Sequence, residues 1–167
     1  MTSGESPSDS PEEIKGNILE FLRRGIEGKG GRIGGETALE WIPKLYVALG
    51  NRFPDTPETR QFKDEVVEQI TSGENPHRIA IYIAECYNYA TDWEPNSYSI
   101  ARFMRSAVQL FSDEFMDIEE VIPEPDRGEI EEIDEILDSP RPNVEPLGDV
   151  RIPGWVPDSH WWWTKGR

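Results

Sequence analysis

The stretch NPHRIAIYIAECYNYA, residues 75–90, is apolar around nearly its whole circumference when it is drawn as an α-helix. A helix of this kind is buried on nearly every side in a folded protein. Its main apolar stripe consists of Ile79, Tyr82, Ile83, Cys86, Tyr87 and Ala90, and the stripe is widened by Ala80, Ile81 and Ala84. This stretch therefore predicts the central helix of a fold in which other helices surround it.

Three helices are predicted before this stretch and one after it, each with apolar residues at helical spacing. The first begins with Ser10 as its N-cap, with Glu13 completing a capping box, and ends at Gly25. The second covers residues 39–50 and contains Pro43, so it either starts near Trp41 or kinks there. The third is predicted between residues 55 and 73, and the fifth from residue 96 or 97 to about 118 or 122.

These helices, together with the absence of any alternating strand pattern, predict an all-α fold: a bundle of about five helices over residues 10–122. Residues 1–9 consist mainly of serine, glycine, proline and acidic residues, which predicts a disordered leader. Residues 123–167 are expected to form an extended acidic tail that contains proline and tryptophan.

Acidic residues outnumber basic ones by 33 to 17, and the net charge of −16 disfavours direct binding to nucleic acid or to anionic lipid. The charge is uneven, because residues 119–149 hold twelve acidic residues and only two basic ones. Such a stretch can imitate a phosphate backbone, so an acidic nucleic-acid mimic that inhibits a basic partner is an alternative function.

Cys86 is the only cysteine, so the chain forms no internal disulfide, and a reduced intracellular location is expected. The N-terminus lacks the pattern of a signal peptide, and no apolar run approaches the roughly 20 residues that cross a bilayer. The sequence therefore predicts a soluble cytoplasmic or otherwise intracellular protein with no membrane association.

Few residues suggest chemistry. Cys86 lies on the apolar stripe, where a cysteine packs as a small hydrophobe, and His77 is expected to face solvent or to cap its helix. The glycine-rich residues 25–35 include Lys29 and Arg32, but they lack the spacing of a phosphate-binding loop and predict a hinge. No zinc or calcium pattern is present. We therefore expect no catalytic, cofactor-binding or metal-binding residues, and an unrecognised enzyme is a further, weaker alternative.

The extension contains two segments with apolar anchors. Residues 128–138 place Ile130, Ile133, Ile136 and Leu137 on one narrow face of an acidic helix, which predicts docking into a groove. A proline-rich spacer follows, and the chain ends with Ile152, Trp155 and the run Trp161-Trp162-Trp163.

Three adjacent indoles bury too much apolar area to remain in water. Either the terminus folds back onto its own bundle, or it docks on another chain, and the frequency of tryptophan at interface hot spots slightly favours the second alternative.

The sequence therefore predicts a non-enzymatic protein that binds other proteins, as an adaptor, a regulator or an assembly factor. Its partner is another protein or a second copy of this chain, which would make a homo-oligomer. The predicted partner-binding residues are Ile130, Ile133, Ile136, Leu137, Ile152, Trp155, Trp161, Trp162 and Trp163.

Overall fold

The computed structural model describes four stretches of the chain: residues 10–25, 32–92, 94–139 and 152–164. The predicted leader, most of the glycine-rich hinge and most of the proline-rich spacer lie outside these residues. Within the described stretches the protein is helical, with seven α-helices, two short 3-10 helices and no β-strand. The elements are α1 (Pro11–Arg24), α2 (Gly35–Ala48), α3 (Pro57–Ile70), α4 (Asn75–Thr91), α5 (Pro95–Glu114), α6 (Ile118–Val121), η2 (Glu124–Asp126), α7 (Glu129–Asp138) and η4 (Trp161–Trp163).

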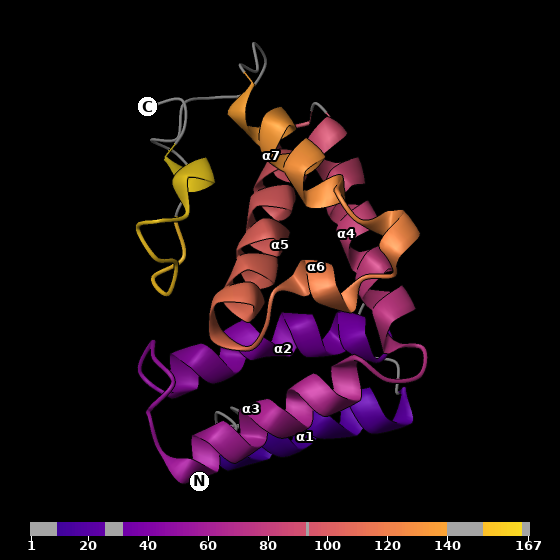
Figure 1. Cartoon of the computed structure of the whole chain (residues 1–167). Coiled ribbons are helices and arrows are strands. Elements are labelled where there is room, and N and C mark those ends of the chain that lie inside the picture. Colours follow the sequence, from indigo (N-terminus) through magenta and orange to yellow (C-terminus); the bar gives the residue numbers. More distant parts are fainter. Residues whose placement is uncertain (1–9, 26–31, 93, 140–151, 165–167) are drawn as a thin grey trace, which may run out of the picture.

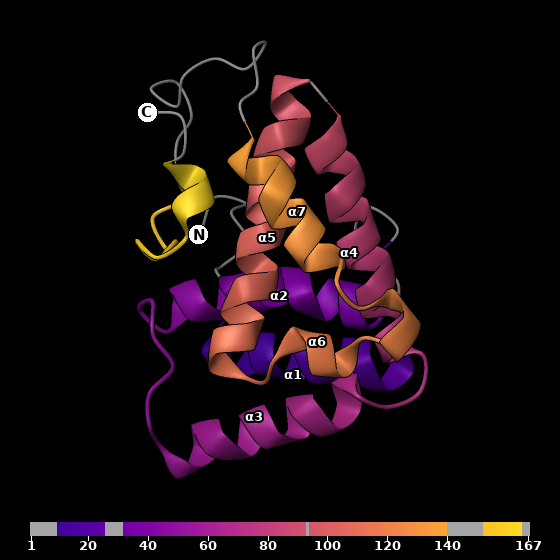
Figure 2. The same cartoon turned by 45° about the horizontal axis from the view of Figure 1, so that its top comes forward.

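The helices form two groups. Figure 1 shows α1, α2 and α3 side by side in one layer, with α4, α5 and α7 standing at a steep angle to them. The same arrangement is visible from the second direction in Figure 2. Helix α2 joins the groups, because it packs against α1 in its own layer and against α4 and α5 in the other.

The start of the first helix agrees with the sequence. The Ser10 side chain caps α1 by accepting a hydrogen bond from the backbone N–H of Glu13, at 3.2 Å, and Pro11 is the first helical residue. Gly25 ends the helix in the left-handed conformation, with φ of 60°, which glycine adopts without steric strain. Local residues are sufficient to define this helix.

Helix α2 starts six residues before Trp41 and continues through Pro43, so a start near Trp41 is wrong. The reason is a tertiary contact. The Asn75 side chain accepts a 2.9 Å hydrogen bond from the backbone N–H of Gly35, one of the groups that a helix start leaves without an internal partner. A Cβ atom on Gly34 would lie 2.8 Å from that same amide oxygen, so the approach requires a glycine.

Helix α4 is not buried on every side, which corrects the expectation for the central helix. Its main stripe is buried except for the partly buried Tyr87, and burial of Cys86 raises the thiol pKa to about 12. However, Ala80, Ile81 and Ala84 remain partly exposed. Helix α5 contributes ten buried residues and is the more enclosed of the two.

The fifth helix ends at Glu114, earlier than expected, and the chain turns into α6, where the Ser112 hydroxyl accepts a hydrogen bond from the Ile118 N–H. Helix α7 then packs against α4. Its residues Ile133 and Leu137 are buried in the same hydrophobic core as the first five helices. The hydrophobic core therefore continues past residue 122 into α7, and the autonomous folding of residues 10–122 stays a prediction. No helix in the described part of the chain is long and apolar enough to cross a membrane.

Candidate functional site

The C-terminal segment, residues 152–164, lies along α5 on the side facing away from α4 (Figures 1 and 2). Its three adjacent tryptophans form the single 3-10 turn η4, so their side chains point in different directions. Trp162 and Trp163 are 2% and 3% exposed, whereas Trp161 is 36% exposed. Two indoles are therefore anchors on the chain's own bundle, and the third lies at the rim.

The two buried indoles converge on one hydroxyl group. The Ser106 Oγ on α5 accepts hydrogen bonds from Trp163 Nε1 at 2.7 Å and from Trp162 Nε1 at 3.0 Å. The His160 Nδ1 lies 2.9 Å from the same oxygen, and the imidazole stacks on Trp162 with ring centroids 4.7 Å apart. Ser106 is fully buried, so this contact is shielded from water.

The surroundings of His160 favour its neutral state. A serine hydroxyl has one hydrogen to donate and two lone pairs to accept with. Indole N–H groups only donate, so Ser106 accepts from Trp163, whereas the single N–H of Trp162 is shared between Ser106 Oγ, at 3.0 Å, and the Arg102 carbonyl oxygen, at 3.2 Å. His160 Nδ1 donates to Ser106 or accepts from it according to the tautomer, and Nε2 is buried without a hydrogen-bond partner among the described residues. Burial lowers the pKa of His160 to about 4, and the charge of Arg105 acts in the same direction, whereas Asp113 opposes it.

Two arginines of α5 also belong to the site, because their guanidinium groups pack on the faces of aromatic rings. The Arg105 guanidinium lies over the Trp162 ring, 4.6 Å from its centroid, and Arg102 lies between the rings of Tyr98 and Trp163, at 4.4 Å and 5.1 Å. These distances are within the range of cation–π attraction. Residues Arg102, Arg105 and Ser106, together with Trp162 and Trp163, are hereafter called the α5 contact.

Arg105 also ties the α5 contact to α7. Its Nε and Nη2 atoms donate hydrogen bonds of 2.7 Å and 3.1 Å to the two carboxylate oxygens of Asp134. The Tyr98 hydroxyl on α5 donates a further bond of 3.1 Å to the backbone carbonyl of Leu137. Helix α7 is thus held to α5 by directional polar bonds, in addition to its packing against α4.

The other predicted anchors also contact their own chain. Ile133 and Leu137 are buried, and Ile130, Ile136 and Ile152 are partly buried against the core. Trp155 is partly buried as well, with its ring edge-on to Tyr46 at 6.5 Å and to Phe103 at 6.0 Å. The sequence slightly favoured docking on another chain over folding back, whereas in the structure residues 152–164 fold back onto their own chain.

The Ser106–His160 pair has the spacing of a nucleophile and its base, but its surroundings do not suit catalysis. A nucleophilic serine needs a free lone pair and a path for the substrate. Ser106 is fully buried and accepts two indole hydrogen bonds. A histidine with a pKa of about 4 is also a weak base near neutral pH. The arrangement fits the docking of a peptide segment better than it fits acyl transfer.

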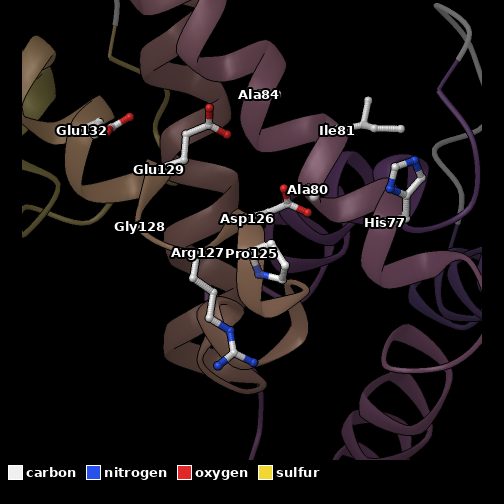
Figure 3. Close-up of a pocket in the computed structure, with 10 residues that line it drawn as sticks. All are labelled: His77, Ala80, Ile81, Ala84, Pro125, Asp126, Arg127, Gly128, Glu129 and Glu132. Carbon is white, nitrogen blue, oxygen red and sulfur yellow. The ribbon is translucent and has the colours of Figure 1, made fainter.

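A hollow of about 460 Å³ lies between α4 and the chain from η2 to the start of α7 (Figure 3). One wall is the partly exposed face of α4, formed by Ala80, Ile81 and Ala84. The other wall carries the carboxylates of Asp126, Glu129 and Glu132. His77, Pro125, Arg127 and Gly128 complete its lining. The hollow is separate from the α5 contact.

Among residues 10–25, 32–92, 94–139 and 152–164, no cluster of three or more histidine, cysteine, aspartate or glutamate side chains could hold a metal ion. No protein-family model, curated protein or solved structure matches this chain.

The polar half of the α5 contact was missed in the sequence. Arg102, Arg105 and Ser106 follow one another at the spacing of a single helix face, within a helix otherwise recognised by its apolar stripe. Two arginines and a serine at this spacing, beside a run of tryptophans elsewhere in the chain, were the available signal. Ser106 itself resembles any helical serine, and only the fold brings it to Trp162 and Trp163.

Proposed function

We propose that this protein acts by binding other proteins, as a non-enzymatic adaptor, regulator or assembly factor. The α5 surface is a receptor for a short aromatic segment, and residues 152–164 of the same chain occupy it here. The observation that carries the proposal is the composition of the α5 contact, in which two indoles dock on two arginines and a serine.

This composition is typical of an interface between proteins rather than of the interior of a helical bundle. Bundle interiors consist mainly of aliphatic side chains, as in the Ile14, Ile18 and Leu22 stripe of α1. Interface centres are enriched in tryptophan, tyrosine and arginine, which also dominate the energetics of binding. Arg102 and Arg105 are 1% and 6% exposed beneath the indoles, as expected for hot-spot residues covered by an anchor.

The segment is separated from α7 by residues 140–151, which contain three of the chain's fourteen prolines. A segment bound through a spacer competes with any external segment for the same surface, because its effective concentration is high. A partner protein with a similar aromatic segment, or a second copy of this chain, therefore binds the α5 surface only by displacing residues 152–164.

A labelled peptide tests this proposal. A fluorescein-labelled peptide of residues 152–167 is titrated with the wild-type chain and with the Trp162→Ala/Trp163→Ala chain, whose own segment has lost its anchors. We expect saturable binding that is at least tenfold tighter to the double variant, because its surface is vacant. Circular dichroism confirms that the variant remains helical.

The matched control is the same peptide with both anchor tryptophans replaced by alanine, which is expected not to bind. Equal binding of the two peptides, or no saturable binding to either chain, would contradict a receptor for aromatic segments. The Ser106→Leu substitution alters the α5 contact. If this substitution abolishes binding of the native peptide, the receptor lies on α5.

The acidic face of α7 favours the alternative function, charge mimicry of nucleic acid. Glu131, Glu132, Glu135 and Asp138 are exposed on this helix. Binding through such exposed charges weakens steeply with salt, because interactions are screened beyond about 10 Å at 0.1 M. Binding through the indole anchors depends much less on salt. Measuring the affinity of the labelled peptide and of a basic partner protein at low and at high salt therefore distinguishes the two functions.

A further inference from the structure

We propose that the hollow between α4 and the η2–α7 segment is a second docking surface, and that its occupant is a basic amphipathic segment of a partner protein. A lysine or arginine of the partner would lay its alkyl stem on α4 and present its charge to the acidic wall. This surface is independent of the α5 contact, and neither proposal depends on the other.

The first observation is the apolar wall. Ala80, Ile81 and Ala84 belong to the helix whose sequence is apolar nearly all round, yet the residues that the structure describes cover only part of this face. The solvent side of an amphipathic helix ordinarily carries polar residues. Two alanines also leave room for the backbone or the stem of another segment to approach α4 closely. This face therefore has the composition of a surface that packs against another segment.

The second observation is the charge of the opposite wall. Asp126, Glu129 and Glu132 form no salt bridge with any of the residues that the structure describes. Figure 3 shows the Arg127 guanidinium turned away from them, and its Nε donates instead to the Ile122 carbonyl, at 3.1 Å. Burial, together with the charges of Glu132 and Asp126, raises the pKa of Glu129. An incoming cation would relieve this crowding of negative charge.

The two walls together select the occupant. Lysine and arginine combine an apolar stem with a charged head, so they match a site with one apolar wall and one acidic wall. A volume of about 460 Å³ accommodates more than a single ion and lies within the usual range of roughly 300–1,000 Å³ for ligand pockets. A metal ion is not supported, because these carboxylates do not form a metal-binding cluster. The net charge of −16 would also steer a basic partner toward the protein.

The test uses the full chain and a synthetic amphipathic helical peptide made of leucine, alanine and lysine, with a fluorescent label. Binding is followed by anisotropy, and its position is mapped by amide chemical-shift changes in the ¹⁵N-labelled protein. We expect saturable binding, with shifts concentrated at residues 77–84 and 125–132. A peptide of the same composition without the amphipathic pattern, and spermine as a small polycation, are expected to bind at least tenfold more weakly.

The charge-removing variant of the hollow is paired with a control variant that loses the same number of charges, so that a change in net charge alone cannot explain weaker binding. Glu129→Gln/Glu132→Gln removes two charges from the hollow, and Glu131→Gln/Glu135→Gln removes two exposed charges from the same helix. We expect the first pair to weaken binding at least tenfold and the second pair less than twofold. As an independent block, Ala84→Arg would place a cation in the hollow and reduce binding by a similar factor.

Equal weakening by the two glutamine pairs would overturn the proposal and favour charge mimicry, as would spermine binding as tightly as the amphipathic peptide. Chemical shifts that map to the α5 contact would overturn it as well and assign the peptide to the surface of the proposed receptor. Circular dichroism of every variant confirms its helix content before binding is compared.

Discussion

The indole nitrogen of Trp163 lies 2.7 Å from the hydroxyl oxygen of Ser106, a residue 57 positions earlier in the chain. This bond joins the last described helical turn to the middle of α5, in an environment from which water is excluded. A buried hydrogen bond adds only about 1 kcal/mol when it is made, but a buried group left without its partner costs about 1–3 kcal/mol. The contact therefore fixes where the terminus docks more than how strongly it docks.

Replacing the tryptophans separately tests which of them anchor the terminus and which one lies at the rim of the contact. We expect Trp162→Ala/Trp163→Ala to lower the melting temperature by several degrees, because ~1 kcal/mol moves a protein of this size by roughly 2–4 °C. Trp161→Ala is the matched control, since this indole is 36% exposed, and it should change the melting temperature by no more than about 1 °C. Thermal melts followed by circular dichroism give both values, and an equal effect of the single and double variants would contradict the assignment.

Ser106→Ala tests the shared hydroxyl directly. The substitution removes the acceptor of two indole hydrogen bonds and the partner of His160 Nδ1, so we expect a loss of about 1–3 kcal/mol in the free energy of unfolding. Ser159→Ala is the control, because Ser159 is exposed in the same segment. Urea denaturation measures both variants, and a loss no larger than that of the control would show that the hydroxyl is dispensable.

The sequence predicted most of the helices because their signals are local. The Ser10 cap, the Gly25 stop and the apolar stripe of α4 depend on residues within a few positions of one another. The start of α2 could not be predicted, because the group that caps Gly35 is Asn75, forty residues away. The same limit applies to the site, where the tryptophans are conspicuous in the sequence and Ser106 is not.

The docked terminus should weaken in acid. The pKa of His160 is about 4 in the folded chain against an ordinary value of 6.5, so the unfolded chain binds more protons between these values. The contribution of neutral His160 to the free energy of unfolding is fully present above pH 6.5 and is lost as the pH falls toward 4. At 1.36 kcal/mol for each unit between these two pKa values, the loss is on the order of 3 kcal/mol. A protonated imidazole would also place a second positive charge in a buried site beside Arg105.

Comparison with His160→Asn isolates this effect, because the side-chain amide of asparagine can donate to Ser106 or accept from it but does not titrate. The raised pKa values of Glu36, Glu40 and Glu129 act with the opposite sign, so the informative quantity is the difference between the two chains. Denaturation midpoints between pH 7.5 and 4 measure this difference. Parallel pH profiles for the two proteins would show that His160 does not control docking.

The Arg105–Asp134 pair should stabilise the junction of α5 and α7. The Arg105 side chain is 7% exposed and that of Asp134 is 30% exposed, so Asp134→Asn leaves a nearly buried guanidinium with a weaker acceptor. We expect a loss of about 1–3 kcal/mol, less than the 3–5 kcal/mol typical of a fully buried pair. Glu135→Gln, an exposed position on the same helix, should stay within about 0.5 kcal/mol of wild type in urea denaturation.

Truncation tests whether α7 belongs to the bundle. The sequence pattern predicts that residues 10–122 fold on their own, but Ile133 and Leu137 lie in the shared core. Removing α7 exposes the surface that these two side chains cover, at about 1.5–3 kcal/mol for each. It also removes the carboxylate partner of Arg105. We therefore expect a chain of residues 10–139, which keeps α7 but lacks the docked tryptophans, to unfold cooperatively somewhat below the wild-type midpoint. A chain of residues 10–122 should unfold at a clearly lower urea concentration still, with a broader transition. Circular dichroism and urea denaturation of both chains measure the difference, and equal midpoints would establish residues 10–122 as an autonomous domain.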